Sequence, residues 1–344
     1  MVDIFLTQIR QLDFWGIFMT KKRFFVFGII FIFLVVLFLL GPTEKANTTL
    51  QPVNLSEDLD AYLQESEGKY EDIIPKTEKK IFWTEPTKKN KTRYSIVYIH
   101  GFSASRQEYT PIFENFAKEI GANIFFTRLR GHGRSGDALS NVSENDWLND
   151  GAEALEIGNR IGDKTIIICS STGCTIGVWL AMQEKWKNIH TIIMLSPNFM
   201  PASFFSKMVL LPWGKYAIKL ALGDTYEWTP KNELQGKYWT TRHKSEVLYT
   251  MMKLVKLVDQ LDLSKFTLPV LIIYNEEDPV VSSSAIKRKY AQMGSTIKKK
   301  IAFPVKGIAK HVVAGDILSP QSNETMLNYV RDFFTSLEKN TPKN

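Results

Sequence analysis

The chain has 344 residues, of which 44% are hydrophobic and 23% charged, a balance that excludes a long disordered or low-complexity protein. Lys and Arg total 43 against 36 Asp and Glu, so the net charge is +7. That mild excess suits contact with an anionic membrane face, and without a nucleic-acid motif we expect no nucleic-acid partner.

An apolar run opens the chain. Residues Phe24–Leu40 contain no charge over 17 positions, and as a helix they would span roughly 25 Å, near the lower limit for a bilayer crossing. Three basic residues stand directly before the run, whereas one stands in the twenty positions after it. This asymmetry predicts a cytoplasmic segment at 1–23, a transmembrane signal anchor at 24–40 and a domain outside the cytoplasm.

A cleaved secretory signal peptide is the alternative for the same run, and it would give a secreted protein. The apolar core is longer than the usual signal-peptide core, and no A-x-A-like cleavage site follows it. We therefore favour an uncleaved anchor.

Residues 41–79 are polar and rich in charge and proline, so we expect a stalk there. The following domain, predicted at 80–344, begins with a short lead-in strand at 80–84.

From Tyr94 onward the pattern alternates between short, apolar β-branched or aromatic runs and amphipathic stretches. The predicted strands are 95–100, 123–127, 165–169, 191–195 and 270–274, with a shorter one around 301–303, and the predicted helices are 109–120, 143–161 and 175–186. Strands apolar on both faces are typical of a buried parallel sheet. The alternation predicts an α/β fold with a mostly parallel central sheet flanked by helices.

The stretch at about 197–265 interrupts this alternation. It is helical in pattern and rich in large apolar residues, so we expect an inserted helical cap above the sheet. Ligands in such sheets bind at the carboxyl ends of the strands, under such a cap. Phe199, Met200 and Phe204 are therefore candidate substrate contacts, together with Phe102, although some apolar side chains of the insertion must be core.

A serine flanked by small residues follows the third core strand. The sequence Cys169-Ser170-Ser171-Thr172-Gly173 stands between an apolar strand and an apolar helix, which is the arrangement of a nucleophile elbow. The small flanks let neighbouring backbone pass close to a strained serine, and the helix N-terminus favours developing negative charge.

Three further segments complete a catalytic pattern. His100-Gly101-Phe102 ends an early strand, Asp278 lies just past a late strand, and His311 follows the last one. Each alone is more often a turn or a structural residue. Together with Ser171 they give the chain order Ser, Asp, His, with each residue after a predicted strand.

These residues resemble the α/β-hydrolase superfamily, and in detail its monoacylglycerol lipase, lysophospholipase and serine aminopeptidase branch. The resemblance extends from about Tyr94 to Leu337. It is carried by HGF at 100–102, by RGHGRS at 130–135, by the elbow, by EEDPVV at 276–281 and by His311. Cys169 and Asn275 depart from the glycines usual at their positions, and neither departure removes a chemical role.

The resemblance implies a role for each matching residue. Ser171 would be the nucleophile, His311 its general base and Asp278 the residue that orients His311. The amides of Phe102 and Thr172 would form the oxyanion hole. Glu276 and Glu277 leave the identity of the acid open.

The two cysteines of the chain, Cys169 and Cys174, are too few for a disulfide scaffold or a cysteine-rich zinc site. A disulfide between them would straddle the elbow and strain it, so we expect none. The five histidines have no ligand spacing, and we expect neither a metal nor an organic cofactor.

The main functional hypothesis is a membrane-anchored serine hydrolase of carboxylic esters, with a small ester or lipid-like substrate and an acyl-enzyme intermediate. Aminopeptidase, thioesterase and acyltransferase activities use the same triad and remain open. A non-catalytic binding module is the third hypothesis, and it is disfavoured because all three triad residue types are present.

Overall fold

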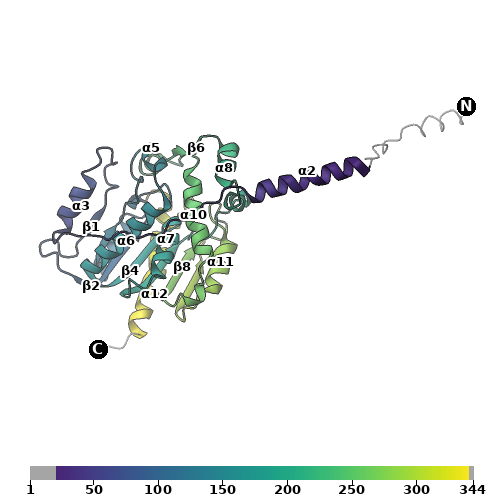
Figure 1. Ribbon diagram of the computed structural model, residues 1–344. Coiled ribbons are helices and arrows are strands. Elements are labelled where there is room, and N and C mark those ends of the chain that lie inside the picture. The colour runs from purple at the N-terminus through teal and green to yellow at the C-terminus, as the bar shows by residue number, and fades with distance from the viewer. Residues whose placement is uncertain (1–20, 341–344) are drawn as a thin grey trace, which may run out of the picture. The chain divides into compact units, whose positions relative to one another are not determined.

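The structure, a computed structural model, describes residues 21–340 (Figure 1). Most of the expected cytoplasmic segment 1–23 lies outside the described residues. The chain divides into two compact units, one ending at Thr43 and the other beginning at Glu44.

The first unit contains helix α2 (Lys21–Leu39). All its large apolar side chains from Phe24 onward are exposed, because an apolar sequence offers no polar face and one helix cannot cover itself. No helix in the described part of the chain is both long enough and apolar enough to cross a membrane. The prediction of a transmembrane anchor at 24–40 is therefore not supported.

A seven-stranded sheet forms the centre of the second unit, with the strand order β1-β3-β2-β4-β5-β8-β9. The strands are β1 (Lys80–Phe82), β2 (Thr92–Ile99), β3 (Asn123–Phe126), β4 (Gly162–Ser170), β5 (Ile189–Leu195), β8 (Val270–Tyr274) and β9 (Lys298–Ala302). Only the pairing of β1 with β3 is antiparallel among these described strands. This confirms the predicted α/β fold with its mostly parallel sheet.

Helices cover both faces of the sheet, because successive strand residues point to opposite sides. Val97 and Ile99 belong to one core cluster, and Ile96 and Tyr98 to the other. The first cluster is completed by α3 (Leu59–Glu67), α6 (Glu144–Ile161), α7 (Thr172–Ala181), α10 (Val247–Asp259) and α11 (Ser283–Gln292), and the second by α4 (Ile112–Glu119) and α12 (Asn323–Asn340).

The segment at 44–79, expected to belong to a stalk, instead packs on the domain that contains the sheet. Helix α3 begins at an Asp58 N-cap and buries Leu59 and Leu63, one helical turn apart, in the first core cluster. Closer to its start, the Asn47 amide donates to Glu144 Oε1 at 2.9 Å. This segment is therefore part of the compact second unit.

The insertion after β5 contains the 3-10 helix η2 (Phe204–Leu210), α8 (Gly214–Leu222) and α9 (Glu233–Tyr238). It also contains a two-stranded sheet of β6 (Thr225–Glu227) and β7 (Arg242–Lys244), which the sequence did not predict. The last helix of the expected cap, α10, packs among the core residues with α6 and α7. The inserted part proper therefore ends before Val247.

Candidate active site

Ser171 lies at a sharp turn between β4 and α7. Its backbone has φ 49° and ψ −118°, a region that residues with a side chain rarely adopt. The turn is tight because β2 passes beside it: a Cβ on Gly173 would lie 2.2 Å from the Ile99 carbonyl oxygen. Backbone strain of this kind is typical of residues whose position matters for function.

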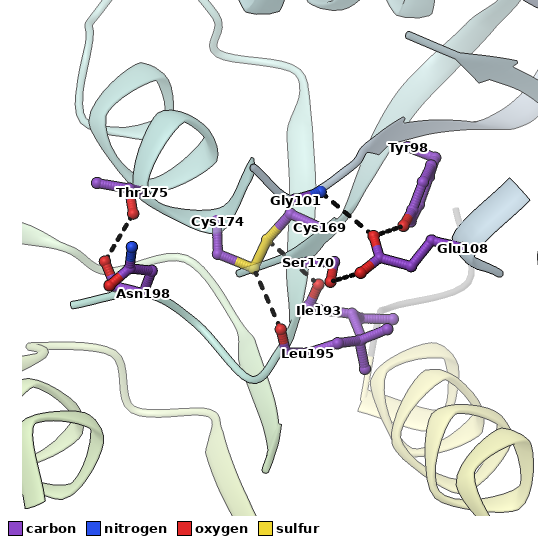
Figure 2. The surroundings of a disulfide bond; sticks show 10 residues. All are labelled: Tyr98, Gly101, Glu108, Cys169, Ser170, Cys174, Thr175, Ile193, Leu195 and Asn198. Carbon is purple, nitrogen blue, oxygen red and sulfur yellow. Dashed lines mark hydrogen bonds between the residues drawn. A yellow bond between two sulfur atoms is a disulfide. The ribbon is translucent and has the colours of Figure 1, made fainter. Parts of the chain in front are cut away.

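A disulfide joins Cys169, the last but one residue of β4, to Cys174 on α7 (Figure 2). The expectation of two free thiols is thus wrong. The turn at Ser171 folds α7 back against the end of β4, so the two cysteine Cα atoms are 4.8 Å apart, a distance that a disulfide spans easily. The bridge encloses the nucleophile elbow.

His311 and Asp278 are hydrogen-bonded, with His311 Nδ1 2.7 Å from Asp278 Oδ2. The other carboxylate oxygen, Oδ1, accepts from the amides of Val280 and Val281 at 2.8 and 3.1 Å. Burial works to raise the pKa of Asp278, but His311 and these two amides outweigh it, and the pKa is lowered. The carboxylate is therefore ionised and fixed in orientation.

The neighbouring carboxylates are engaged elsewhere. Glu276 accepts from Tyr274 at 2.7 Å and pairs with Lys287 at 2.6 Å, and Glu277 pairs with Lys310. Neither contacts His311, so the structure singles out Asp278 as the acid that faces the imidazole.

Two consecutive residues at the carboxyl end of β5 connect the elbow to His311. The Leu195 carbonyl accepts from the Ser171 amide at 2.9 Å, and the hydroxyl of the next residue, Ser196, donates to the His311 carbonyl at 2.7 Å. The backbones of Ser171 and His311 thus lie at the same edge of the sheet, where the carboxyl ends of its parallel strands gather.

The turn after β2 lies directly against Ser171. A Cβ built on Gly101 would be 3.2 Å from the Ser171 Cβ. Phe102 follows Gly101, and Thr172 is the first residue of α7, whose first-turn amides have no acceptor within the helix. Both amides expected in an oxyanion hole therefore belong to segments that flank Ser171.

His100 has a structural role. Its Nδ1 is 2.9 Å from the Gly101 carbonyl, and its Nε2 accepts from the Leu129 amide at 3.1 Å, which assigns the proton to Nδ1. Burial lowers the pKa of His100 to about 4, so the ring is neutral. It holds the turn after β2 against the loop of the RGHGRS motif.

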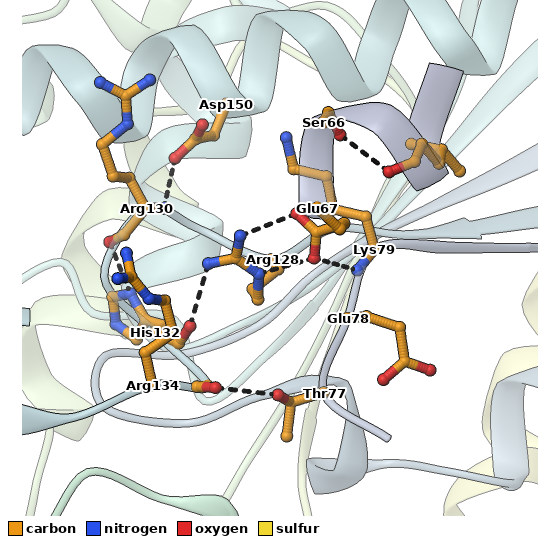
Figure 3. A network of polar contacts seen from close by, with 12 residues as sticks. Ser66, Glu67, Thr77, Glu78, Lys79, Arg128, Arg130, His132, Arg134 and Asp150 are labelled. Atoms are coloured by element: carbon orange, nitrogen blue, oxygen red, sulfur yellow. Dashed lines mark hydrogen bonds and ion pairs between the residues drawn. The ribbon is translucent and has the colours of Figure 1, made fainter. Parts of the chain in front are cut away.

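That loop is held from the other side by a buried ion pair. Arg128 donates two hydrogen bonds to Glu67, both 2.7 Å long, and a third at 3.3 Å to the His132 carbonyl (Figure 3). Burial works to lower the pKa of Arg128, but Glu67 raises it. The segment before β1 therefore fixes the loop that carries His132.

The four expected substrate contacts occupy different environments. Phe199 and Met200 are buried in the first core cluster, 1% and 9% exposed. Phe102 is partly buried, and its ring lies 6.0 Å from that of His132 and 5.3 Å from that of His243. The side chain of Phe204 lies outside the described residues.

Sequence reasoning missed two side chains beside the candidate site. His243 comes from β7 and reaches Phe102 because the insertion folds back over the sheet. Glu108 is fully buried next to Gly101 and Ser170. Neither position stands in a motif or a periodic pattern, so the sequence offered no signal for them.

No group of three or more His, Cys, Asp or Glu side chains in residues 21–340 is placed to hold a metal ion.

Solved structures with the same fold include lipolytic enzymes. A metagenome-derived lipolytic enzyme of the LipS and LipT study has a TM-score of 0.63 and 19% identity, and the match covers 77% of this chain and 99% of that one. The soluble variant of monoglyceride lipase from Saccharomyces cerevisiae, in complex with a substrate analogue, has a TM-score of 0.58 and 15% identity, covering 77% and 92%. Monoacylglycerol lipase from Paleococcus ferrophilus has a TM-score of 0.56 and 14% identity, covering 75% and 98%.

No curated protein is significantly similar to this chain in sequence. The family model described as "Serine aminopeptidase, S33" matches residues 90–306, well over half of the chain, and it includes Ser171 and Asp278. On this match, and on the fold, the chain belongs to the serine aminopeptidase S33 family of α/β-hydrolase enzymes.

Proposed function

We propose that the protein is a serine hydrolase that cleaves carboxylic esters through Ser171, His311 and Asp278. The observation that carries the proposal is the 2.7 Å hydrogen bond between His311 and a fixed, ionised Asp278. This pair lies at the edge of the sheet where Ser171 occupies a strained elbow. That combination is the arrangement in which a serine hydroxyl becomes a nucleophile.

In the proposed reaction, Ser171 Oγ attacks the ester carbonyl carbon while His311 takes the hydroxyl proton. Nδ1 is committed to Asp278, so Nε2 is the nitrogen that accepts this proton. The tetrahedral intermediate breaks its bond to the alcohol oxygen, which leaves with the proton from His311. Water then attacks the acyl-enzyme by the same route and releases the acid and free Ser171.

The amides of Phe102 and Thr172 would stabilise the negative charge that develops on the carbonyl oxygen. The N-terminus of α7 adds its dipole at the same place. Removing one donor of this kind typically raises the barrier by about 3 kcal/mol.

A lipid-like acyl ester is the proposed substrate class. Two of the similar structures are monoacylglycerol and monoglyceride lipases, and a third is a lipolytic enzyme. The insertion also exposes large apolar side chains, including Phe205, Met208 and Leu220, which favours contact with apolar molecules.

A fluorophosphonate probe tests the chemistry directly. We expect the wild-type protein to be labelled at Ser171, as mapped by mass spectrometry of the labelled peptide, and to hydrolyse a chain-length series of acyl esters. Ser171→Ala should abolish both, whereas Ser336→Ala on α12, whose hydroxyl donates to the Phe333 carbonyl, serves as the control. Labelling that persists in Ser171→Ala would overturn the assignment.

A serine aminopeptidase is the second candidate, because the matching family model carries that description. Peptide amides, thioesters and acyl transfer to an alcohol all use the same three side chains. Peptide and thioester analogues therefore belong in the same substrate panel, and kcat/KM for an amide above that for the matched ester would favour the peptidase. A protein that binds lipid without any turnover would favour the binding module.

We also propose that α2 attaches the enzyme to a membrane and that the hydrolase domain lies outside the cytoplasm. The exposed apolar side chains at 24–40 need an apolar environment. A disulfide persists in oxidising compartments, which supports an exported domain, and the cluster of basic residues at 21–23 agrees with it. The alternative is a secreted enzyme after cleavage. Fractionation of cells that express the full chain distinguishes a membrane-attached enzyme from a secreted one, with a form beginning at Glu44 as the comparison without α2.

A further inference from the structure

One buried carboxylate lies between the two segments that flank the nucleophile. Glu108 ends the 3-10 helix η1 (Arg106–Glu108) and is 2% exposed. Its Oε2 accepts from the Tyr98 hydroxyl at 2.9 Å and from the Gly101 amide at 3.2 Å. Its Oε1 accepts from the Ser170 hydroxyl at 3.0 Å (Figure 2).

The partners of this carboxylate hold the positions that matter most for the proposed chemistry. Gly101 immediately precedes Phe102, and Ser170 immediately precedes Ser171. A Cβ on Gly101 would be 3.5 Å from Glu108 Oε1 and 3.2 Å from the Ser171 Cβ, so Gly101 is held between the two. A single carboxylate therefore connects the turn after β2 to the end of β4.

The contacts around Glu108 are those of an ionised acceptor, because three separate donors point at its two oxygens. The pKa of Glu108 is raised, because burial outweighs the Gly101 amide, His311 and the two hydroxyls, which lower it. An apolar side chain would fill the same space without this desolvation, so filling the core does not explain a carboxylate here.

We propose that Glu108 is a positioning residue that sets the distance between the Phe102 amide and Ser171. The role rests on the proposed hydrolase function. Glu108 binds Gly101, which precedes Phe102, and Ser170, which precedes Ser171. It thereby fixes the position of the oxyanion-hole turn relative to the nucleophile. Misplacement of one donor by a fraction of an ångström weakens stabilisation of the transition state more than binding of the substrate.

Glu108 also acts on the imidazole at a distance. Burial works to lower the pKa of His311, while two carboxylates raise it: Asp278, from the loop after β8, and Glu108, from η1. Glu108 itself faces Tyr98 on β2 and Tyr109, which directly follows η1. Removing its charge should therefore move the acid limb of the pH profile to lower pH, an effect that a merely structural role would not produce.

The test compares Glu108→Gln with Glu114→Gln, which makes the same chemical change at a carboxylate of α4 outside the site. We expect Glu108→Gln to lower kcat by about 10- to 100-fold with KM within about twofold, because one oxyanion donor is weakened and not removed. Its acid limb should move to lower pH, while Glu114→Gln keeps wild-type kinetics. The rate of fluorophosphonate labelling of Ser171 in each variant reports the reactivity of the nucleophile separately from ester turnover.

Wild-type kcat and an unchanged acid limb in a folded Glu108→Gln would overturn the role, as would an equal loss in Glu114→Gln. If Glu108→Gln does not fold, Ser170→Ala decides, because it removes one donor from the carboxylate. A severalfold loss of kcat at constant KM supports the role, and wild-type kcat overturns it. If the wild-type protein is not labelled by the fluorophosphonate and hydrolyses no ester, the proposed function is overturned, and the role of Glu108 with it.

Discussion

The close packing of α7 against β2 makes Gly173→Ala a sharp test of the nucleophile elbow. Gly173 is the second residue of α7. The added Cβ would lie 2.2 Å from the Ile99 carbonyl oxygen and 2.5 Å from that of His100. Both oxygens belong to the backbone that leads into the oxyanion-hole turn, so neither can rotate away as the end of a flexible side chain could.

The size of the effect follows from these two distances. An ordinary carbon–oxygen contact needs about 3.3 Å, so the backbones must separate by roughly 1 Å. A displacement of that size between catalytic groups lowers kcat/KM by about 100-fold. Overpacking of the buried contact should also destabilise the fold by about 1–3 kcal/mol.

Gly177→Ala is the matched control, because it makes the same change one turn further along α7. There the added Cβ would lie 3.4 Å from Ile167 Cγ2 and 3.4 Å from Ile192 Cδ1, which are ordinary contacts. We expect unchanged kcat/KM and a gain in stability of up to about 1 kcal/mol from the better helix propensity of alanine.

The assay measures ester hydrolysis, fluorophosphonate labelling rate and thermal unfolding for both variants. Gly173→Ala with wild-type kcat/KM would refute the reasoning that the close approach of β2 and α7 builds the site. Equal losses in Gly173→Ala and Gly177→Ala would refute it as well, because the structure gives them opposite surroundings.

Three further outcomes follow from the charges and the cross-link. Burial works to lower the pKa of His311, but carboxylates raise it above the ordinary 6.5. Because catalysis needs the neutral ring, kcat/KM should fall with falling pH through a midpoint above 6.5. A midpoint below 6.5 would contradict this. Replacing Cys169 and Cys174 by alanine opens a loop with a sequence separation of 5. This should lower the free energy of unfolding, measured by urea titration, by about 2 kcal/mol. An unchanged free energy of unfolding would contradict the prediction. Glu67→Gln leaves the Arg128 side chain, which is 3% exposed, without its charge partner. The same titrations should show a free energy of unfolding lower by about 3–5 kcal/mol. A decrease under about 1 kcal/mol would contradict the reasoning that the ion pair is buried.

The central sheet was predictable because buried parallel strands leave a strong pattern. The runs at 95–100, 165–169 and 270–274 are apolar on both faces, and all became strands in the interior of the sheet. The N-terminus of α6 was predictable for a similar reason, since Ser143 and Asp146 form a reciprocal cap that can be recognised from their spacing.

Other elements were harder to predict because their partners are distant in the chain. Strands β6 and β7 are three residues each and without apolar alternation, so only their pairing with each other defines them. The disulfide escaped prediction for a geometric reason. The positive φ of Ser171 turns α7 back on β4, which brings the Cα atoms of Cys169 and Cys174 to 4.8 Å.

The candidate site was predictable as far as motifs reach. Ser171, Asp278 and His311 each follow a strand, and parallel topology brings such positions to one edge. Glu108 lies in a short polar stretch without periodicity, and only the fold shows that it is buried and hydrogen-bonded to Tyr98 of β2 and Ser170 of β4.

The packing of residues 44–79 bears on how a shortened form of the enzyme can be produced. Glu67 neutralises Arg128, and Lys79 binds Glu153 at 2.5 Å, both in largely buried surroundings. A truncation that begins at Lys80 would strand an uncompensated arginine and an uncompensated glutamate in the interior and should yield insoluble protein. Crystallisation and enzymology should therefore use a start at Glu44, where the compact unit begins.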